Sequence, residues 1–163
     1  MPSKQGNPLC IMKNYLAIDP GVGGGWAYYN GAEKRIALYP MPDTLCGMRE
    51  LLFSFSDGEG EVILEEVPKY TGKGRNESTT AVLFQNIGRI EGLVVCRQLT
   101  LHRITPVKWQ ATLGIGKRGD MDYAAWKRKL RNKACELYPQ VDNITLKTAD
   151  ALLLLHHFIQ GKL

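Results

Sequence analysis

The sequence lacks the cysteine patterns of a zinc finger or a disulfide framework. Its four cysteines, Cys10, Cys46, Cys96 and Cys135, are isolated, with no C-x-x-C pair and no nearby histidine at zinc-finger spacing. Long apolar runs are also missing, because the stretch 151–155 is far too short to cross a bilayer. We therefore expect reduced structural thiols and no association with a membrane.

The N-terminal stretch lacks the apolar core of a signal peptide. Residues 1–13 are polar and contain Pro2, Gly6 and Pro8, so we expect a flexible tail and a cytoplasmic chain. Hydrophobic residues make up 44% and charged residues 23% of the sequence, which is ordinary for a globular protein. A chain of 163 residues can bury roughly two-thirds of its unfolded surface in one core. Residues 14–163 are therefore predicted to form a single domain.

Basic residues outnumber acidic residues by 21 to 16, which gives a net charge of +5 and a pI near 9.0. This balance favours a polyanionic partner. The basic residues gather in three predicted segments: a loop with Lys69, Lys73 and Arg75, a glycine loop with Lys117 and Arg118, and a helix with Lys127, Arg128, Lys129, Arg131 and Lys133. The helical cluster fits a solvated face and a nucleic-acid contact equally well.

Hydrophobic periodicity and turn signals predict an α/β domain with a mixed five-stranded sheet flanked by helices. The predicted strands are 15–19, 25–30, 35–39, 61–67 and 99–104, and the predicted helices are 43–55, 77–98, 105–114, 122–137 and 148–160. Thr105 with Pro106, and Thr148, fit the first positions of their helices. Gly88 and Gly92 would let another backbone approach the helix 77–98, either in the core, which is the commoner case, or at a dimer interface.

Carboxylates lie at the ends of three apolar segments that are far apart in the sequence. Asp19 ends one predicted strand, Glu65 lies near the end of another, and Asp150 opens an apolar helix. An ionised carboxylate at the end of a buried strand is costly unless something pairs with it. Asp19-Pro20-Gly21 alone is also good turn chemistry. If the three side chains converge, they suit Mg²⁺ or Mn²⁺, which prefer carboxylate and water ligands.

Four short segments occur in a fixed order along nearly the whole chain. They are 16–21 (LAIDPG), 63–67 (ILEEV), 105–110 (TPVKWQ) with 113–116 (LGIG) behind it, and 149–152 (ADAL). In this order they resemble the motifs of the RuvC branch of the ribonuclease H-like nucleases. The resemblance implies a ribonuclease H-like fold and a hydrolase that acts on phosphodiester bonds.

The resemblance also implies roles for individual residues. Asp19, Glu65 and Asp150 would hold two Mg²⁺ ions per site, with Mn²⁺ as a substitute, and Lys108 would lie close to the scissile phosphate. Since neighbouring residues of a strand point to opposite faces, only one of Glu65 and Glu66 easily reaches the site, and the family pattern selects Glu65.

The implied enzyme is a structure-specific endonuclease that resolves four-way (Holliday) DNA junctions in recombination and repair. Symmetric nicking needs two sites, so a homodimer is expected, with the helix 77–98 as the candidate dimer element. Tyr70 fits base stacking and simple shielding of its loop equally well. The candidate DNA-binding residues are Lys69, Tyr70, Lys73, Arg75, Lys108, Lys117 and Arg118.

Two positions depart from the family pattern. Lys147 stands three residues before Asp150, where an acidic residue or a histidine is usual, and a protonated lysine cannot bind a metal. This departure leaves three alternatives: three carboxylates suffice to hold the metal, Asp142 or a histidine contributes a further ligand, or the enzyme is weakened. Pro68 stands where the family often has an aromatic residue, which leaves the choice of substrate open.

Three alternatives therefore remain open at this point. The chain resolves four-way junctions, or it binds branched DNA without cutting it, or it cuts flaps, replication forks or structured RNA. His156 and His157 are expected to be packed or surface residues rather than metal ligands.

Overall fold

Five strands form one mixed sheet in the computed structural model, which describes residues 13–55, 60–67 and 77–160. The strands are β1 (Asn14–Ile18), β2 (Gly25–Asn30), β3 (Arg35–Pro40), β4 (Gly60–Glu65) and β5 (Thr100–Ile104). Their order is β3-β2-β1-β4-β5, with β1, β2 and β3 antiparallel and β1, β4 and β5 parallel. The predicted mixed five-stranded sheet is confirmed.

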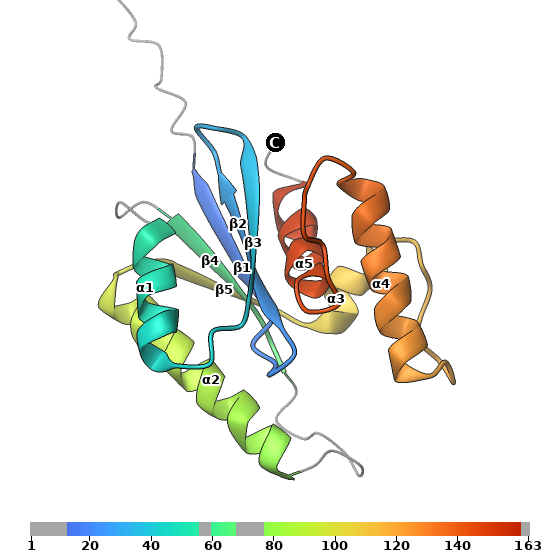
Figure 1. The fold of residues 1–163 in the computed structure, drawn as a ribbon, viewed down its shortest axis with the longest axis horizontal. Helices are drawn as coiled ribbons and strands as arrows, with labels where there is room; N and C mark the ends of the chain where they lie inside the picture. The colour runs from blue at the N-terminus through green and yellow to red at the C-terminus, as the bar shows by residue number, and fades with distance from the viewer. Residues whose placement is uncertain (1–12, 56–59, 68–76, 161–163) are drawn as a thin grey trace, which may run out of the picture.

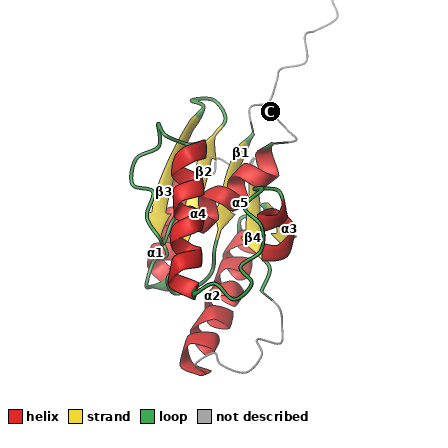
Figure 2. Ribbon diagram, turned by 90° about the vertical axis from the view of Figure 1, so that its right-hand side faces the viewer, coloured by secondary structure: helices red, strands yellow, loops and turns green. Residues whose placement is uncertain are grey.

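Helices cover both faces of this sheet (Figures 1 and 2). They are α1 (Leu45–Phe55), α2 (Glu77–Cys96), α3 (Pro106–Ala111), α4 (Tyr123–Leu137) and α5 (Ala149–Ile159). Figure 1 shows α1 and α2 on one side of the sheet and α3, α4 and α5 on the other. The buried side chains accordingly divide into two hydrophobic clusters, one on each face.

The alternation of side chains along β1 and β4 decides which residues reach which face. Ala17 and Ile63 pack in the cluster of α3, α4 and α5, whereas Ile18 and Leu64 pack in the cluster of α1 and α2. The helix α5 is buried continuously from Ala149 to Leu155, so it forms the centre of its layer. The residue directly after Ile18 and the residue directly after Leu64 therefore both lie on the α5 side of the sheet.

Several element ends differ from the prediction, and two of them lie next to the site. The strand predicted at 61–67 ends at Glu65, and the helix predicted at 105–114 ends at Ala111. The helix stops because the hydroxyl of Thr112 donates a hydrogen bond to the carbonyl of Trp109 (2.7 Å), and Gly114 then adopts a left-handed backbone with φ of 66°. Thr105 and Thr148 occupy their predicted N-cap positions, although neither makes a side-chain capping bond.

The two glycines of α2 do not pack against the core. A Cβ atom added at Gly88 or Gly92 would meet no atom within 4 Å. Core packing, the commoner use of this spacing, is therefore wrong for both glycines. They lie on the outward side of a helix whose Leu83, Ile90 and Val94 face the sheet.

A tight turn between β1 and β2 holds Asp19 in place. The amide of Asp19 donates to the carbonyl of Gly25 (3.0 Å), and the amide of Gly24 donates to the carbonyl of Gly21 (2.8 Å). Gly24 packs directly on Asp19, because an added Cβ would lie 2.7 Å from Asp19 Cγ and 2.9 Å from Oδ1. Only glycine fits at this position without displacing the carboxylate.

The turn supplies a matched pair of variants. We expect Gly24→Ala to lower the free energy of unfolding by about 1–3 kcal/mol, because overpacking forces Asp19 or the backbone to move. Gly23→Ala should stay within about 0.5 kcal/mol of the parent, since an added Cβ there meets nothing within 4 Å. Denaturant unfolding measures both values. Equal stability of the two variants would contradict the described turn.

Candidate active site

Parallel pairing brings Asp19 and Glu65 to the same end of the sheet. Ile18 of β1 pairs with Leu64 of β4, so the next residue of each chain segment is one of these carboxylates. Both continue the face of Ala17 and Ile63, which packs against α5. Glu66 is exposed, in agreement with the selection of Glu65.

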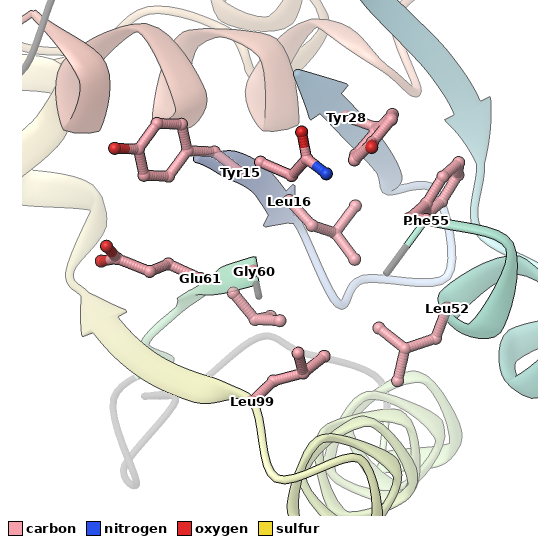
Figure 3. Close-up of a pocket in the computed structure, with 10 residues that line it drawn as sticks. Tyr15, Leu16, Tyr28, Leu52, Phe55, Gly60, Glu61 and Leu99 are labelled. Carbon is pink, nitrogen blue, oxygen red and sulfur yellow. The ribbon is translucent and has the colours of Figure 1, made fainter. Parts of the chain in front are cut away.

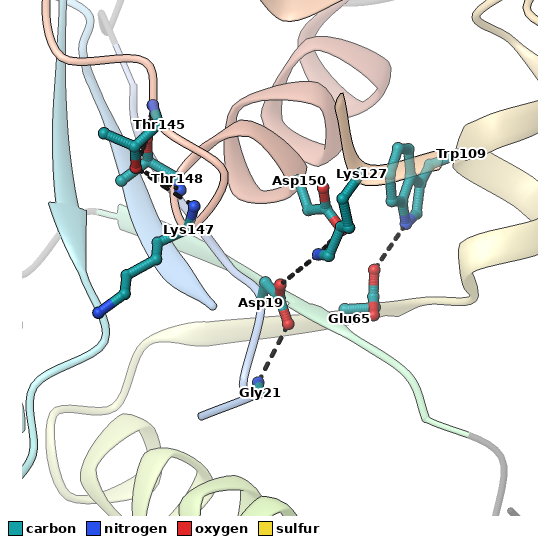
Figure 4. Close-up of polar contacts among 9 residues, drawn as sticks. All are labelled: Asp19, Gly21, Glu65, Trp109, Lys127, Thr145, Lys147, Thr148 and Asp150. Carbon is teal, nitrogen blue, oxygen red and sulfur yellow. Dashed lines mark hydrogen bonds and ion pairs between the residues drawn. The ribbon is translucent and has the colours of Figure 1, made fainter. Parts of the chain in front are cut away.

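The first turn of α5 adds the third carboxylate. Asp150 is 7% exposed and Asp19 is 8% exposed, so both are largely withdrawn from water. Asp19, Glu65 and Asp150 line one cleft of about 720 Å³, which also contains side chains of α3 and α4. Figure 4 shows the three carboxylates arriving from β1, β4 and α5. The three carboxylates that the sequence singled out therefore line the same cleft.

Two donors fix the strand carboxylates. Asp19 Oδ1 accepts a hydrogen bond from the amide of Gly21 (3.0 Å). Glu65 Oε2 accepts a hydrogen bond from the indole Nε1 of Trp109 (2.9 Å), a fully buried residue of α3 (Figure 4). Because Trp109 is locked in the core, it determines where the Glu65 carboxylate lies.

Lys127 of α4 supplies a cation directly beside the carboxylates of the cleft, a placement that the sequence patterns did not indicate. Its Nζ lies 2.6 Å from Asp150 Oδ2 and 3.9 Å from Asp19 Oδ2. The side chains of Lys127, Asp150 and Asp19 are 16%, 10% and 12% exposed. For such a buried pair, removal of one partner costs about 3–5 kcal/mol, because the remaining charge is left uncompensated.

Burial and mutual repulsion shift the titration of these groups. Burial, reinforced by the charges of Asp19 and Asp150, raises the pKa of Glu65 to about 8. Burial also raises the pKa of Asp150 to about 6, although Lys127 opposes the shift. For Lys127 burial alone would lower the pKa, but the neighbouring Asp150 and Asp19 outweigh it and hold the pKa above its usual value.

The donor set fits a hard divalent cation. Carboxylate oxygens are the ligands that Mg²⁺ and Mn²⁺ prefer, and Asp150 Oδ1 is buried without a hydrogen-bond partner among the described residues. Within that same part of the chain, no three Asp, Glu, His or Cys side chains stand close enough to hold one ion together. Joint coordination by Asp19, Glu65 and Asp150 would therefore need side-chain movement.

Lys147 stays away from the carboxylates. Its side chain points away from Asp19 and Asp150 in Figure 4, and its amide donates to the hydroxyl of Thr145 (3.2 Å). Asp142 is exposed and is not among the described residues that line the cleft. The lysine that enters the cleft is thus Lys127 rather than Lys147.

The two histidines of α5 are bonded elsewhere. His156 Nδ1 lies 2.8 Å from the hydroxyl of Tyr138, and His157 Nδ1 lies 3.1 Å from the hydroxyl of Thr112. Burial is the main cause that lowers the pKa of both. Neither is among the described residues that line the cleft, which agrees with the expectation of packed or surface histidines.

The predicted DNA-binding residues have different placements. Arg118 lines the cleft, with its guanidinium 5.9 Å from the ring centre of Tyr123, whereas Lys108 and Lys117 are exposed outside the described lining. Lys69, Tyr70, Lys73 and Arg75 lie outside the described residues. Their roles, like that of Lys108, stay predictions.

The basic cluster of α4 is only partly a solvated face. Lys129 donates to the carbonyl of Ile115 (2.8 Å), and Arg131 donates to the carbonyl of Ile144 (3.1 Å). Lys127, Lys129 and Arg131 therefore hold the site and its neighbouring loops. The sequence suggested either a solvated face or a nucleic-acid contact for this cluster, and neither interpretation included this structural role.

A second hollow lies at the opposite end of β1 and β4 (Figure 3). Its volume is about 10 Å³, room for one water molecule at most. The side chains of Leu16, Leu52 and Leu99 line it together with aromatic residues. Its size and lining make it a packing defect rather than a ligand site.

None of the described helices is both long and apolar enough to pass through a membrane.

Sequence comparison leaves the chain without a match, since no protein-family model and no curated protein matches it. Solved structures do match. The structure of Thermus thermophilus RuvC in complex with a Holliday junction substrate has a TM-score of 0.60 and 15% identity, and the match covers 91% of this chain and 95% of that one. A second structure of Thermus thermophilus RuvC matches with the same identity and coverage and a TM-score of 0.57. The chain therefore has the ribonuclease H-like fold of RuvC, as its motifs predicted.

Proposed function

We propose that this chain is a metal-dependent endonuclease that resolves four-way DNA junctions by hydrolysis of phosphodiester bonds. The observation that carries the proposal is the convergence of Asp19, Glu65 and Asp150 on one cleft of a RuvC fold. The matching RuvC structure is a complex with a Holliday junction substrate, which favours branched DNA as the substrate class.

The carboxylates would hold the metal ions. Asp19 and Asp150 would bind one Mg²⁺ or Mn²⁺ ion, and Glu65 would complete a second site with an oxygen not used by Trp109. When bound, a pair of such ions supplies an activated water and charge stabilisation for in-line displacement at phosphorus. The amide of Gly21 and the indole of Trp109 keep the oxygens oriented toward that task.

Basic and aromatic groups near the cleft would position the DNA. Arg118 and Tyr123 form part of the cleft wall, so a phosphate and a base can contact them together. Lys108 and Lys117 present exposed ammonium groups on α3 and the following loop. Binding should therefore weaken as salt rises, because phosphate contacts release counterions.

A homodimer would place two such clefts on one junction. The outward side of α2 carries Gly88 and Gly92 together with exposed Phe84 and Val95. Small residues allow close approach of a second helix, and the exposed apolar side chains would be withdrawn from water by it. We propose this side of α2 as the dimer surface.

The direct test is cleavage of a labelled four-way DNA junction in Mg²⁺, with linear duplex, flap and RNA controls. Paired symmetric nicks confined to the four-way junction are expected. Tight binding without nicks in Mg²⁺ or Mn²⁺ would instead identify a non-catalytic binder of branched DNA, and cutting of flaps or RNA would identify a different substrate.

Asp19→Asn and Asp150→Asn should abolish cleavage while junction binding is kept. Loss of an outer-shell partner alone costs about 10–100-fold at metal sites, so loss of a ligand should cost about 100-fold or more in rate. Gel-shift binding and single-turnover cleavage separate the two effects. Glu66→Gln, at the exposed neighbour of Glu65, serves as the control and should cut normally. Wild-type cleavage by Asp19→Asn would refute the site assignment.

Without metal, stability should fall as the pH rises. The folded protein raises the pKa of Glu65 to about 8, above the ordinary 4.5, so the folded state binds this proton more tightly than the unfolded state. The stabilisation is complete below pH 4.5 and is lost as the pH rises through 8. The lowered pKa values of His156 and His157 act below 6.5 and in the opposite direction.

Thermal unfolding in EDTA between pH 6.5 and 8 therefore reports mainly on Glu65, because this range lies above the raised pKa of Asp150, which acts in the same direction at lower pH. The midpoint should fall by about 2–4 °C for each kcal/mol lost. Glu65→Gln, which imitates the protonated acid, should flatten the curve, and saturating Mg²⁺ should restore stability at pH 8. A midpoint that rises with pH in the parent protein would be inconsistent with the crowded carboxylates.

A further inference from the structure

We propose that the ammonium group of Lys127 takes the place of a metal ion in the metal-free protein. The ammonium group occupies the position between the carboxylates of Asp19 and Asp150, and it must be displaced when a divalent cation binds. The inference rests on the proposed metal-dependent function and specifies how the same site is loaded.

The position of the ammonium group carries this inference. Nζ lies 2.6 Å from an oxygen of Asp150 and 3.9 Å from an oxygen of Asp19, so it bridges carboxylates supplied by α5 and β1. A cation that binds both oxygens would be placed where the ammonium group already lies. Two cations cannot share that space, because their repulsion is strong in a site largely closed to water. Metal binding and the ion pairs of Lys127 are therefore mutually exclusive.

The lysine satisfies the carboxylates incompletely. Asp150 Oδ1 remains buried and without a hydrogen-bond partner in the described part of the chain, although Oδ2 is bonded to Lys127. A single ammonium group offers one charge and three donors, whereas a divalent ion offers two charges and can bind several oxygens. The site is thus held in a state that a divalent cation can improve.

The backbone at Lys127 is fixed, so the exchange concerns the side chain. Trp126 and Leu130 anchor α4 in the core on either side of this position. The four-carbon stem of Lys127 can turn without movement of the helix.

Tyr123, one helical turn earlier, already lies beside the ammonium group and would stay within its reach after displacement. Its ring centre lies 5.9 Å from Lys127 Nζ, and the residue is 59% exposed on the cleft wall. An ammonium group over this ring would stay in the cleft, where it could face a phosphate of bound DNA.

Competition by Lys127 lowers the apparent affinity for the metal. If the ion-paired state holds about 90% of the metal-free molecules, the apparent Kd is raised roughly tenfold. The same contact keeps the carboxylates neutralised when no metal is bound. Lys127 thus sets the metal concentration at which the site fills.

Calorimetric titration of the full chain with Mn²⁺, without DNA, tests the inference. Lys127→Met should bind Mn²⁺ about tenfold more tightly than the parent and should unfold at a lower temperature in EDTA. Arg128→Met removes the same charge from the next, exposed position of α4 and should leave the Kd unchanged. Equal Kd values for Lys127→Met and the parent would overturn the displacement. Failure of both proteins to bind Mn²⁺ or Mg²⁺ would overturn the metal-dependent function as well.

A measurement on the parent protein covers the case in which Lys127→Met does not fold. Acetylation of lysines, followed by mass spectrometry, should find Lys127 protected in EDTA and reactive at saturating Mn²⁺, while exposed Lys117 reacts equally in both conditions. Protection of Lys127 that persists in saturating Mn²⁺ would show that the metal does not take its place.

Discussion

Electrostatic repulsion among Asp19, Glu65 and Asp150 is the constraint around which the cleft is built. The parallel register of β1 and β4 and the start of α5 crowd three acids into a space largely closed to water. Each must then be neutralised by a proton, a lysine or a metal ion. Burial first, and the neighbouring charges second, raise the pKa values of Glu65 and Asp150, and the ion pairs of Lys127 offset part of the repulsion.

The surrounding structure holds the acids in place against that repulsion. Gly24 allows the β1 to β2 turn to close directly on Asp19, and buried Trp109 binds Glu65 through its indole nitrogen. The apolar helix α5 carries Asp150 at its first turn and packs across the middle of the sheet. The packed hydrophobic layers thus hold in place a charge arrangement that would be unfavourable alone. Such arrangements are common at sites that bind metals and phosphates.

The sequence predicted the parts of the site that follow from strand periodicity and motif order. Asp19, Glu65 and Asp150 could be identified because each ends or opens an apolar segment. Strand alternation admitted only one of Glu65 and Glu66, and the family pattern selected Glu65. Lys127 could not be identified in this way, because it lies among five basic residues of one helix. A signal was nevertheless present: Lys127 stands three residues before core Leu130, and so at the edge of the apolar stripe of α4. The outward position of Gly88 also needed tertiary structure, since spacing alone fits a core or an interface.

The central claim is that the three carboxylates form one metal centre from which Lys127 is displaced. Anomalous diffraction from a crystal of the full chain soaked in Mn²⁺ tests this claim most directly. The account predicts Mn²⁺ in the cleft, with one peak between Asp19 and Asp150, a second beside Glu65, and the Lys127 ammonium group moved away from Asp19 and Asp150. A cleft that holds no Mn²⁺ at saturating concentration, or a peak beside an undisturbed pair of Lys127 and Asp150, would contradict it.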